Sequence, residues 1–181
     1  MKYNLHISYI FSNFAPYKNN IINPGAQNPT QQLHNMNIKT FTTDYDFATT
    51  ANAQDMDIID AQVLKANTNL LNELATWYHL DIHDSLIADS IDCMVQELEP
   101  ELLIKSLSIT QDLSTGSTII TFNWEVQDLD FVNDSYIDIE EDYIPTIASF
   151  MLKFHDMQNN EGTYITTYNK GTNTFTTTYT L

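Results

Sequence analysis

Residues 103–127 read LIKSLSITQDLSTGSTIITFNWEVQ, and this stretch decides the fold. In its second half, residues 118–127, side chains alternate between a mainly apolar and a mainly polar face, as on a strand with one buried face. The first half, residues 103–112, has the β-branched and apolar composition of a partner strand. Between them lies Gly116, a residue with the backbone freedom that a tight turn requires. The stretch therefore predicts an antiparallel hairpin.

The C-terminus repeats this arrangement. Residues 164–168 and 175–179 are rich in threonine and aromatic residues, which suit a pleated surface. The intervening residues 169–173, NKGTN, are turn formers. A second hairpin is therefore predicted at the end of the chain.

Three helices are predicted from apolar residues spaced by threes and fours. The first spans residues 56–78. The second spans residues 84–99 and ends before Pro100. The third is marked by apolar residues within 144–154 and ends near residues 159–162. Together these elements predict an α+β fold with three helices packed on an antiparallel sheet, built mainly from the two β-hairpins.

The chain has two compositional parts. Residues 1–35 contain no acid and are rich in Asn, Gln and Pro, whereas residues 36–181 contain all 24 acids. We interpret residues 1–35 as a poorly structured N-terminal tail or upstream extension, and residues 36–181 as a single acidic domain. The alternative for the first part is an added N-terminal strand at residues 5–11. No transmembrane run or targeting signal is recognised, so a cytoplasmic location is expected.

The charge is the strongest functional signal. The chain has no arginine, and seven lysines against 24 acids give a formal net charge of −17. Such a surface repels nucleic acid and anionic membranes, and it attracts cationic partners over long range. Direct binding of nucleic acid or membrane is therefore not expected, and the partner is expected to be a basic protein.

An acidic stretch with interleaved aromatic residues is the first candidate site. If residues 134–140 are extended, alternate carboxylates share one face at a spacing of about 6.8 Å, which resembles a row of phosphates. Carboxylates also suit the forked donors of arginine. The candidate partner-binding residues of this row are Asp128, Asp130, Asp134, Tyr136, Asp138, Glu140 and Glu141.

A second candidate row lies on the predicted second helix and consists of Asp89, Asp92 and Glu99. Both rows have a structural alternative. Acids before a helix favour its positive end, which would explain residues 140–142 without a partner. Acids on an exposed helix face can also be simply solvated.

Enzymatic and metal-binding functions have little support in the sequence. No nucleophile motif or phosphate-binding glycine loop is present, so no catalytic residue, cofactor or metal ligand is assigned. The acidic pair at residues 128–130 departs from the EF-hand pattern because Val132 occupies the fifth position. The histidines lack the spacing of a zinc site.

The expected function is therefore that of a non-enzymatic acidic protein that blocks the basic, nucleic-acid-binding surface of a nuclease or related partner. In charge and size, though in no motif, the chain resembles the DNA mimics that phages and mobile elements use as anti-restriction or anti-CRISPR inhibitors. Two alternatives remain open. One is an immunity protein or antitoxin against a basic toxin nuclease. The other is an acidic secretion chaperone, which would act as a homodimer.

Overall fold

The computed structural model describes residues 36–45, 56–126, 138–158 and 160–181, and the predicted N-terminal extension lies outside these residues. Five strands and three helices make up the described chain. In order they are β1 (Met36–Thr42), α4 (Met56–Trp77), α5 (Ser85–Val95), β2 (Leu102–Asp112), β3 (Thr118–Val126), α6 (Ile139–Met157), β4 (Thr163–Asn169) and β5 (Thr174–Thr180).

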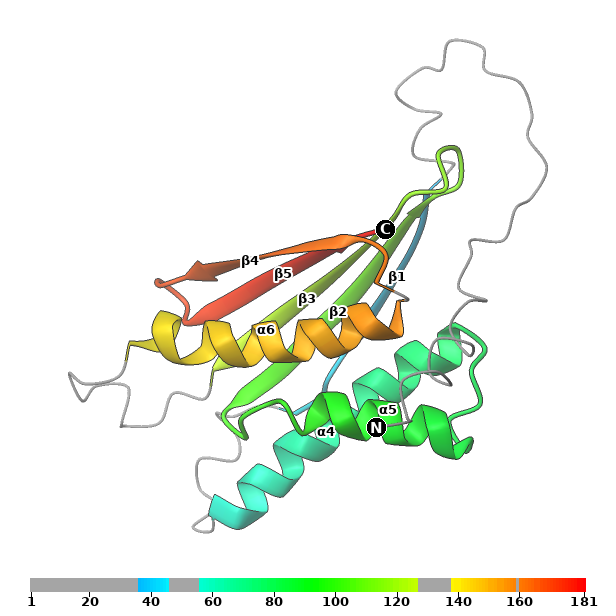
Figure 1. Cartoon of the computed structure of the whole chain (residues 1–181). Coiled ribbons are helices and arrows are strands. Elements are labelled where there is room, and N and C mark those ends of the chain that lie inside the picture. Colours follow the sequence, from blue (N-terminus) through cyan, green and yellow to red (C-terminus); the bar gives the residue numbers. More distant parts are fainter. Residues whose placement is uncertain (1–35, 46–55, 127–137, 159) are drawn as a thin grey trace.

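The strands form one antiparallel sheet in the order β1-β2-β3-β5-β4 (Figure 1). Both predicted hairpins are present, as β2–β3 and β4–β5, and β5 pairs with β3 to join them. The predicted α+β fold, with three helices on an antiparallel sheet, is thus confirmed. Strand β1 was not predicted and adds an edge next to β2.

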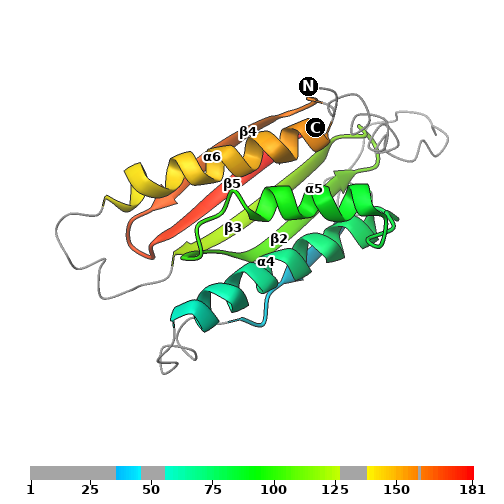
Figure 2. The same cartoon turned by 60° about the horizontal axis from the view of Figure 1, so that its bottom comes forward.

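The three helices lie side by side on one face of the sheet, with α5 between α4 and α6 (Figure 2). Each helix buries an apolar stripe, as in Ile87, Ile91 and Met94 of α5. None of the helices in the described ranges lies on the opposite face of the sheet. The described residues therefore form a two-layer arrangement in which they leave one face of the sheet open.

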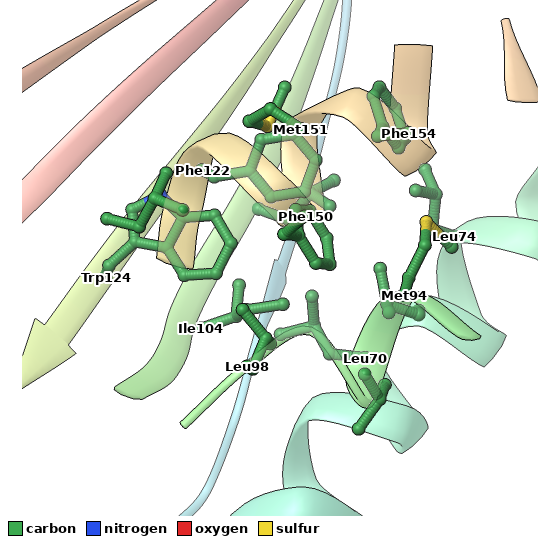
Figure 3. Packing of buried hydrophobic residues seen from close by; sticks show 14 of the residues in the cluster. Leu70, Leu74, Met94, Leu98, Ile104, Phe122, Trp124, Phe150, Met151 and Phe154 are labelled. Atoms are coloured by element: carbon green, nitrogen blue, oxygen red, sulfur yellow. The ribbon is translucent and has the colours of Figure 1, made fainter. Parts of the chain in front are cut away.

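Aromatic residues fill the space between α6 and the sheet (Figure 3). Phe122 and Trp124 of β3 are fully buried beneath Phe150 and Phe154 of α6. Their rings meet edge to face at centroid distances of 5.1 to 5.6 Å, a favourable arrangement for aromatic pairs. The buried indole N–H of Trp124 donates to the hydroxyl of Thr177 on β5 at 3.0 Å. This contact satisfies a polar group that burial would otherwise leave without water.

At the beginning of β2, a side chain of helix α4 forms the backbone hydrogen bonds that a neighbouring strand would otherwise form. The register of β1 stops opposite Ser106, so the beginning of β2 has no β1 partner. There Asn67 of α4, fully buried, donates to the carbonyl of Leu102 at 3.0 Å and accepts from the amide of Ile104 at 2.8 Å. Asn67 therefore holds α4 against the sheet through backbone groups that an additional strand would otherwise bind.

Two differences between the observed and the predicted element boundaries affect the candidate residues. Helix α5 ends at Val95, with Gln96 as its C-cap, so Glu99 lies in the connection to β2 and not on the helix. The predicted row of Asp89, Asp92 and Glu99 on one helix is therefore wrong as a helical row. Helix α6 begins at Ile139, before the apolar residues that predicted it, because Asp138 caps it.

Candidate functional site

The two candidate rows are only partly within the described chain. Asp128, Asp130, Asp134 and Tyr136 lie outside the described residues. Asp138, Glu140 and Glu141 lie at the start of α6, Asp89 and Asp92 on α5, and Glu99 between α5 and β2.

The carboxylates at the start of α6 have a structural role. Asp138 Oδ1 accepts from the amides of Glu140 and Glu141 at 3.1 and 3.5 Å, and thereby caps the helix. Glu140, Glu141 and Asp142 occupy the first turn, where negative charge is favoured by the helix dipole. The predicted extended row is therefore wrong at Glu140, which is helical.

These acids nevertheless meet others that are distant in sequence. Burial, the negative charges of Glu101 and Glu99, and then the adjacent Asp142, raise the pKa of the half-buried Tyr143 to about 12. A nearby like charge disfavours the phenolate, so the effect of Glu99 and Glu101 on Tyr143 places the α5–β2 connection close to the first turns of α6. The fold thus brings Glu99 to the acidic start of α6.

A second tyrosine extends this region onto the sheet. Burial raises the pKa of Tyr168 at the end of β4, and the charges of Asp138 and Glu140 raise it further. The hydroxyl of Tyr168 donates to Asn173 Oδ1 at 3.1 Å, across the β4–β5 turn. We call the carboxylates gathered around these two tyrosines the acidic end: Glu99, Glu101, Asp138, Glu140, Glu141 and Asp142.

Among the described residues, no ion pair includes a carboxylate of the acidic end. The two ion pairs within the described chain join Lys105 to Glu125 at 3.2 Å and Lys153 to Glu97 at 3.8 Å. Neither pair includes a carboxylate of the acidic end. Four of its six carboxylates come from one short segment, and five of the six, all except Glu141, raise the pKa of Tyr143 or of Tyr168. The region therefore presents concentrated negative charge around tyrosine rings.

The acids of α5 lie on the same layer of the molecule. Asp89 and Asp92 are exposed on the central helix of that layer (Figure 2). Asp92 Oδ2 accepts from Gln96 Nε2 at 2.7 Å, a contact within the helix end. These two carboxylates continue the negative charge of the helical layer without joining the acidic end directly.

Charge is partitioned between the two layers. The strands contain only two carboxylates, Asp112 and Glu125, both near strand ends. Glu125 is paired with Lys105, and Asp112 is held in the β2–β3 turn by Ser114, whose hydroxyl and amide lower its pKa. The acids of the described chain therefore belong overwhelmingly to the helices and connections.

Other kinds of site have less support. Within the described ranges, no group of three His, Cys, Asp or Glu side chains converges to hold a metal ion. A cleft of about 420 Å³ lies between the end of β1 and α4, and Lys65 and Glu73 line it with mostly polar neighbours. His155 Nδ1 lies 3.0 Å from the hydroxyl of Tyr179, which donates to the carbonyl of Glu161. This contact joins the end of α6 to β5.

Sequence reasoning missed Glu101, which the fold places with Glu99 beside Tyr143. The signal available was its position two residues after Glu99, across Pro100, just before a buried strand.

Within the described chain, no helix has the length and apolar character needed to cross a membrane. Neither the protein-family models, nor the curated proteins, nor the solved structures compared with this chain match it.

Proposed function

We propose that this protein is a non-enzymatic acidic inhibitor that occupies the nucleic-acid-binding surface of a basic partner, such as a nuclease. The observation that carries the proposal is the partition of charge. The carboxylates gather on the helical layer and its acidic end, whereas the sheet is almost free of them. A partner that normally holds phosphates with arginine and lysine is complementary to such a surface.

The acidic end is the centre of the proposed contact. Its carboxylates are unpaired within the described chain, so binding arginine does not first require breaking an internal ion pair. Arginine can form two parallel hydrogen bonds to one carboxylate. Tyr143 and Tyr168 add partly exposed aromatic rings, over which a guanidinium can stack. Asp89 and Asp92 extend the negative field across α5 and would accelerate association.

The proposal excludes direct binding of nucleic acid, because phosphate would be repelled by the same surface. It assigns no catalytic residue and no cofactor. An immunity protein that neutralises a basic toxin nuclease would use the same physical attraction. It would differ in having one cognate partner.

The test is partner capture on the immobilised full chain from host lysate at low and at high salt. The expected result is retention of a nucleic-acid-binding protein that is released by salt and displaced by added double-stranded DNA or RNA. The addition of nucleic acid is the decisive step, because a partner that binds the chain through a surface other than its nucleic-acid site would remain on the immobilised chain. Retention that nucleic acid does not affect would overturn the mimicry, and a single captured nuclease would favour the immunity protein.

A further inference from the structure

The open face of the sheet is uncharged over its whole central area. Three successive rows cross all five strands in register. The central row runs through Thr40, Ser108, Thr121, Thr178 and Ile165. Its neighbours run through Ile38, Thr110, Ile119, Thr180 and Thr163, and through Thr42, Ser106, Asn123, Thr176 and Thr167. We call these fifteen positions the threonine face.

The absence of charge from this face is unusual for the surface of such a chain. Charged residues make up 17% of the whole chain, so fifteen average positions would include about two or three of them. The charges nearest the face lie at its two ends, where Lys105 pairs with Glu125 and Asp112 closes a turn. An uncharged centre with charges at its rim is the composition of a protein interface.

Three polar side chains of the threonine face satisfy one another by hydrogen bonds that run across the strands. Thr176 Oγ1 donates to Asn123 Oδ1 at 3.2 Å, and Asn123 Nδ2 donates to Ser106 Oγ at 2.9 Å. This chain of hydrogen bonds crosses β5, β3 and β2. Burial of hydroxyl and amide groups is costly mainly when it leaves them unpaired. These three side chains can therefore be covered by another uncharged surface at low cost.

Apolar side chains add a favourable contribution to such burial. Ile165 and Ile38 are 71% and 60% exposed, and Ile119 is also exposed. They lie on β4, β1 and β3, so apolar contacts are distributed across the whole face. Each isoleucine covered by a partner removes apolar surface from water.

We propose that the threonine face is a homodimer interface, on which a second copy of this chain packs face to face. The net charge of the chain is the reason for choosing a second copy as the partner on this face. Two copies with a net charge of −17 each can approach only through a surface from which the carboxylates are absent, and the threonine face lies opposite the acidic helical layer. Stacked sheets lie about 10 Å apart, so the two acidic layers point outward.

The size of the face is sufficient. Three rows about 6.8 Å apart on five strands about 4.8 Å apart cover roughly 20 by 24 Å, or about 500 Å² on each copy. The pair thus buries about 1,000 Å², which is the lower limit for a specific interface. A reversible, concentration-dependent dimer follows. The inference does not rest on the proposed inhibition of a basic partner.

Sedimentation velocity of the full chain over a concentration series, up to about 1 mM, tests the inference. The exposed Cys93 on α5 can carry a fluorophore for the dilute end of the series, because it lies on the helical layer. We expect a monomer of 20.8 kDa that converts to a dimer with rising concentration. Added salt should strengthen the dimer, since it screens the repulsion between two acidic copies. Salt should weaken binding to a basic partner, so the two proposals respond in opposite directions.

Two variants locate the interface. Thr121→Glu places a charge at the centre of the face on both copies and should raise the dimer dissociation constant at least tenfold. Ile165→Glu should do the same, and it tests the face without risk to folding, because the side chain is already in solvent. Gln62→Glu on the exposed side of α4 adds the same charge elsewhere and should change little. A monomer at all concentrations, a dimer weakened by salt, or a dimer that survives both face variants would overturn the inference.

Discussion

The carboxylate of Glu101 lies near the phenol of Tyr143 and helps to raise its pKa to about 12, although one residue precedes β2 and the other belongs to α6. This relationship joins two segments that are separated in sequence by a whole hairpin. It shows that the acidic end is assembled by the fold and is not a property of one acidic run. The same relationship makes the cluster measurable without any partner.

Replacing Glu99 and Glu101 with glutamine should lower the pKa of Tyr143. Burial is the largest cause of the raised pKa and would remain, so the pKa should fall only part of the way towards the ordinary value near 10. The measurement is a pH titration by NMR on the chain with ¹³C-labelled tyrosine, with Tyr143→Phe to assign the signal. Asp60→Asn is the matched control. An unchanged pKa in the double variant would show that the α5–β2 connection is not near Tyr143.

The free energy of unfolding should fall at alkaline pH, because the phenol of Tyr143 loses its proton there. The pKa of Tyr143 is raised in the folded state, so its contribution to folding is fully present below pH 10 and is lost as pH rises towards 12. In Tyr143→Phe, urea unfolding should show a smaller loss of stability over this range than in the original chain. An identical loss in both proteins would contradict the raised pKa.

Asn67→Ala should destabilise the fold by about 2–4 kcal/mol, because it leaves two buried backbone groups of β2 without partners. Asn69→Ala, at an exposed position on the same helix, should change the free energy of unfolding by less than about 0.5 kcal/mol. Urea unfolding followed by circular dichroism measures both. Equal effects would mean that the side chain of Asn67 does not replace a strand at the edge of β2.

Two glycines with positive φ should differ in their tolerance of alanine. A Cβ at Gly162 would lie 2.5 Å from the carbonyl oxygen of Thr180 and 2.8 Å from the ring of Tyr179, whereas a Cβ at Gly116 meets nothing within 4 Å. Gly116→Ala should therefore cost about 1 kcal/mol of conformational strain alone. Gly162→Ala should cost at least about 3 kcal/mol, because backbone must also move. Thermal unfolding of the two variants gives the comparison, and a larger loss at Gly116 would contradict the packing at the start of β4.

Much of the fold was predictable because its elements carry regular patterns. The alternating pattern of residues 118–127 predicted strand β3, which the structure has at Thr118–Val126. The turn predicted at Gly116 joins this strand to β2, and Gly116 has a positive φ there. Strand β1 was missed because only Phe41 on its inward side is buried, so an alternating apolar signal is absent. The pairing of β5 with β3 also has no local signal, since it depends on how the two hairpins meet around α6.

The site was less predictable than the fold. Spacing alone suggested an extended row through Glu140, but Asp138 provides a cap that starts α6 one residue later. Acid content drew attention to Glu99, but the helix that was predicted to include this residue ends at Val95. The position of Glu101 near Tyr143 depends on how distant segments pack together. The threonine face depends on which strands pair and in which register. Neither can be read from the pattern of a single sequence.

The most direct measurement compares two triple variants in their binding to a short oligoarginine peptide. One variant neutralises the acidic end by Glu99→Gln, Glu101→Gln and Asp142→Asn. The control carries Asp60→Asn, Asp156→Asn and Glu161→Gln, and so has the same net charge with the acidic end intact.

Fluorescence anisotropy over a salt series gives the affinity and its salt dependence. We expect the acidic-end variant to bind about tenfold more weakly, with a smaller salt dependence, since each lost charge pair contributes about 0.3–1 kcal/mol. The control should stay within about threefold of the original chain. Equal losses in the two variants would mean that overall charge, and not the assembled acidic end, attracts the basic partner.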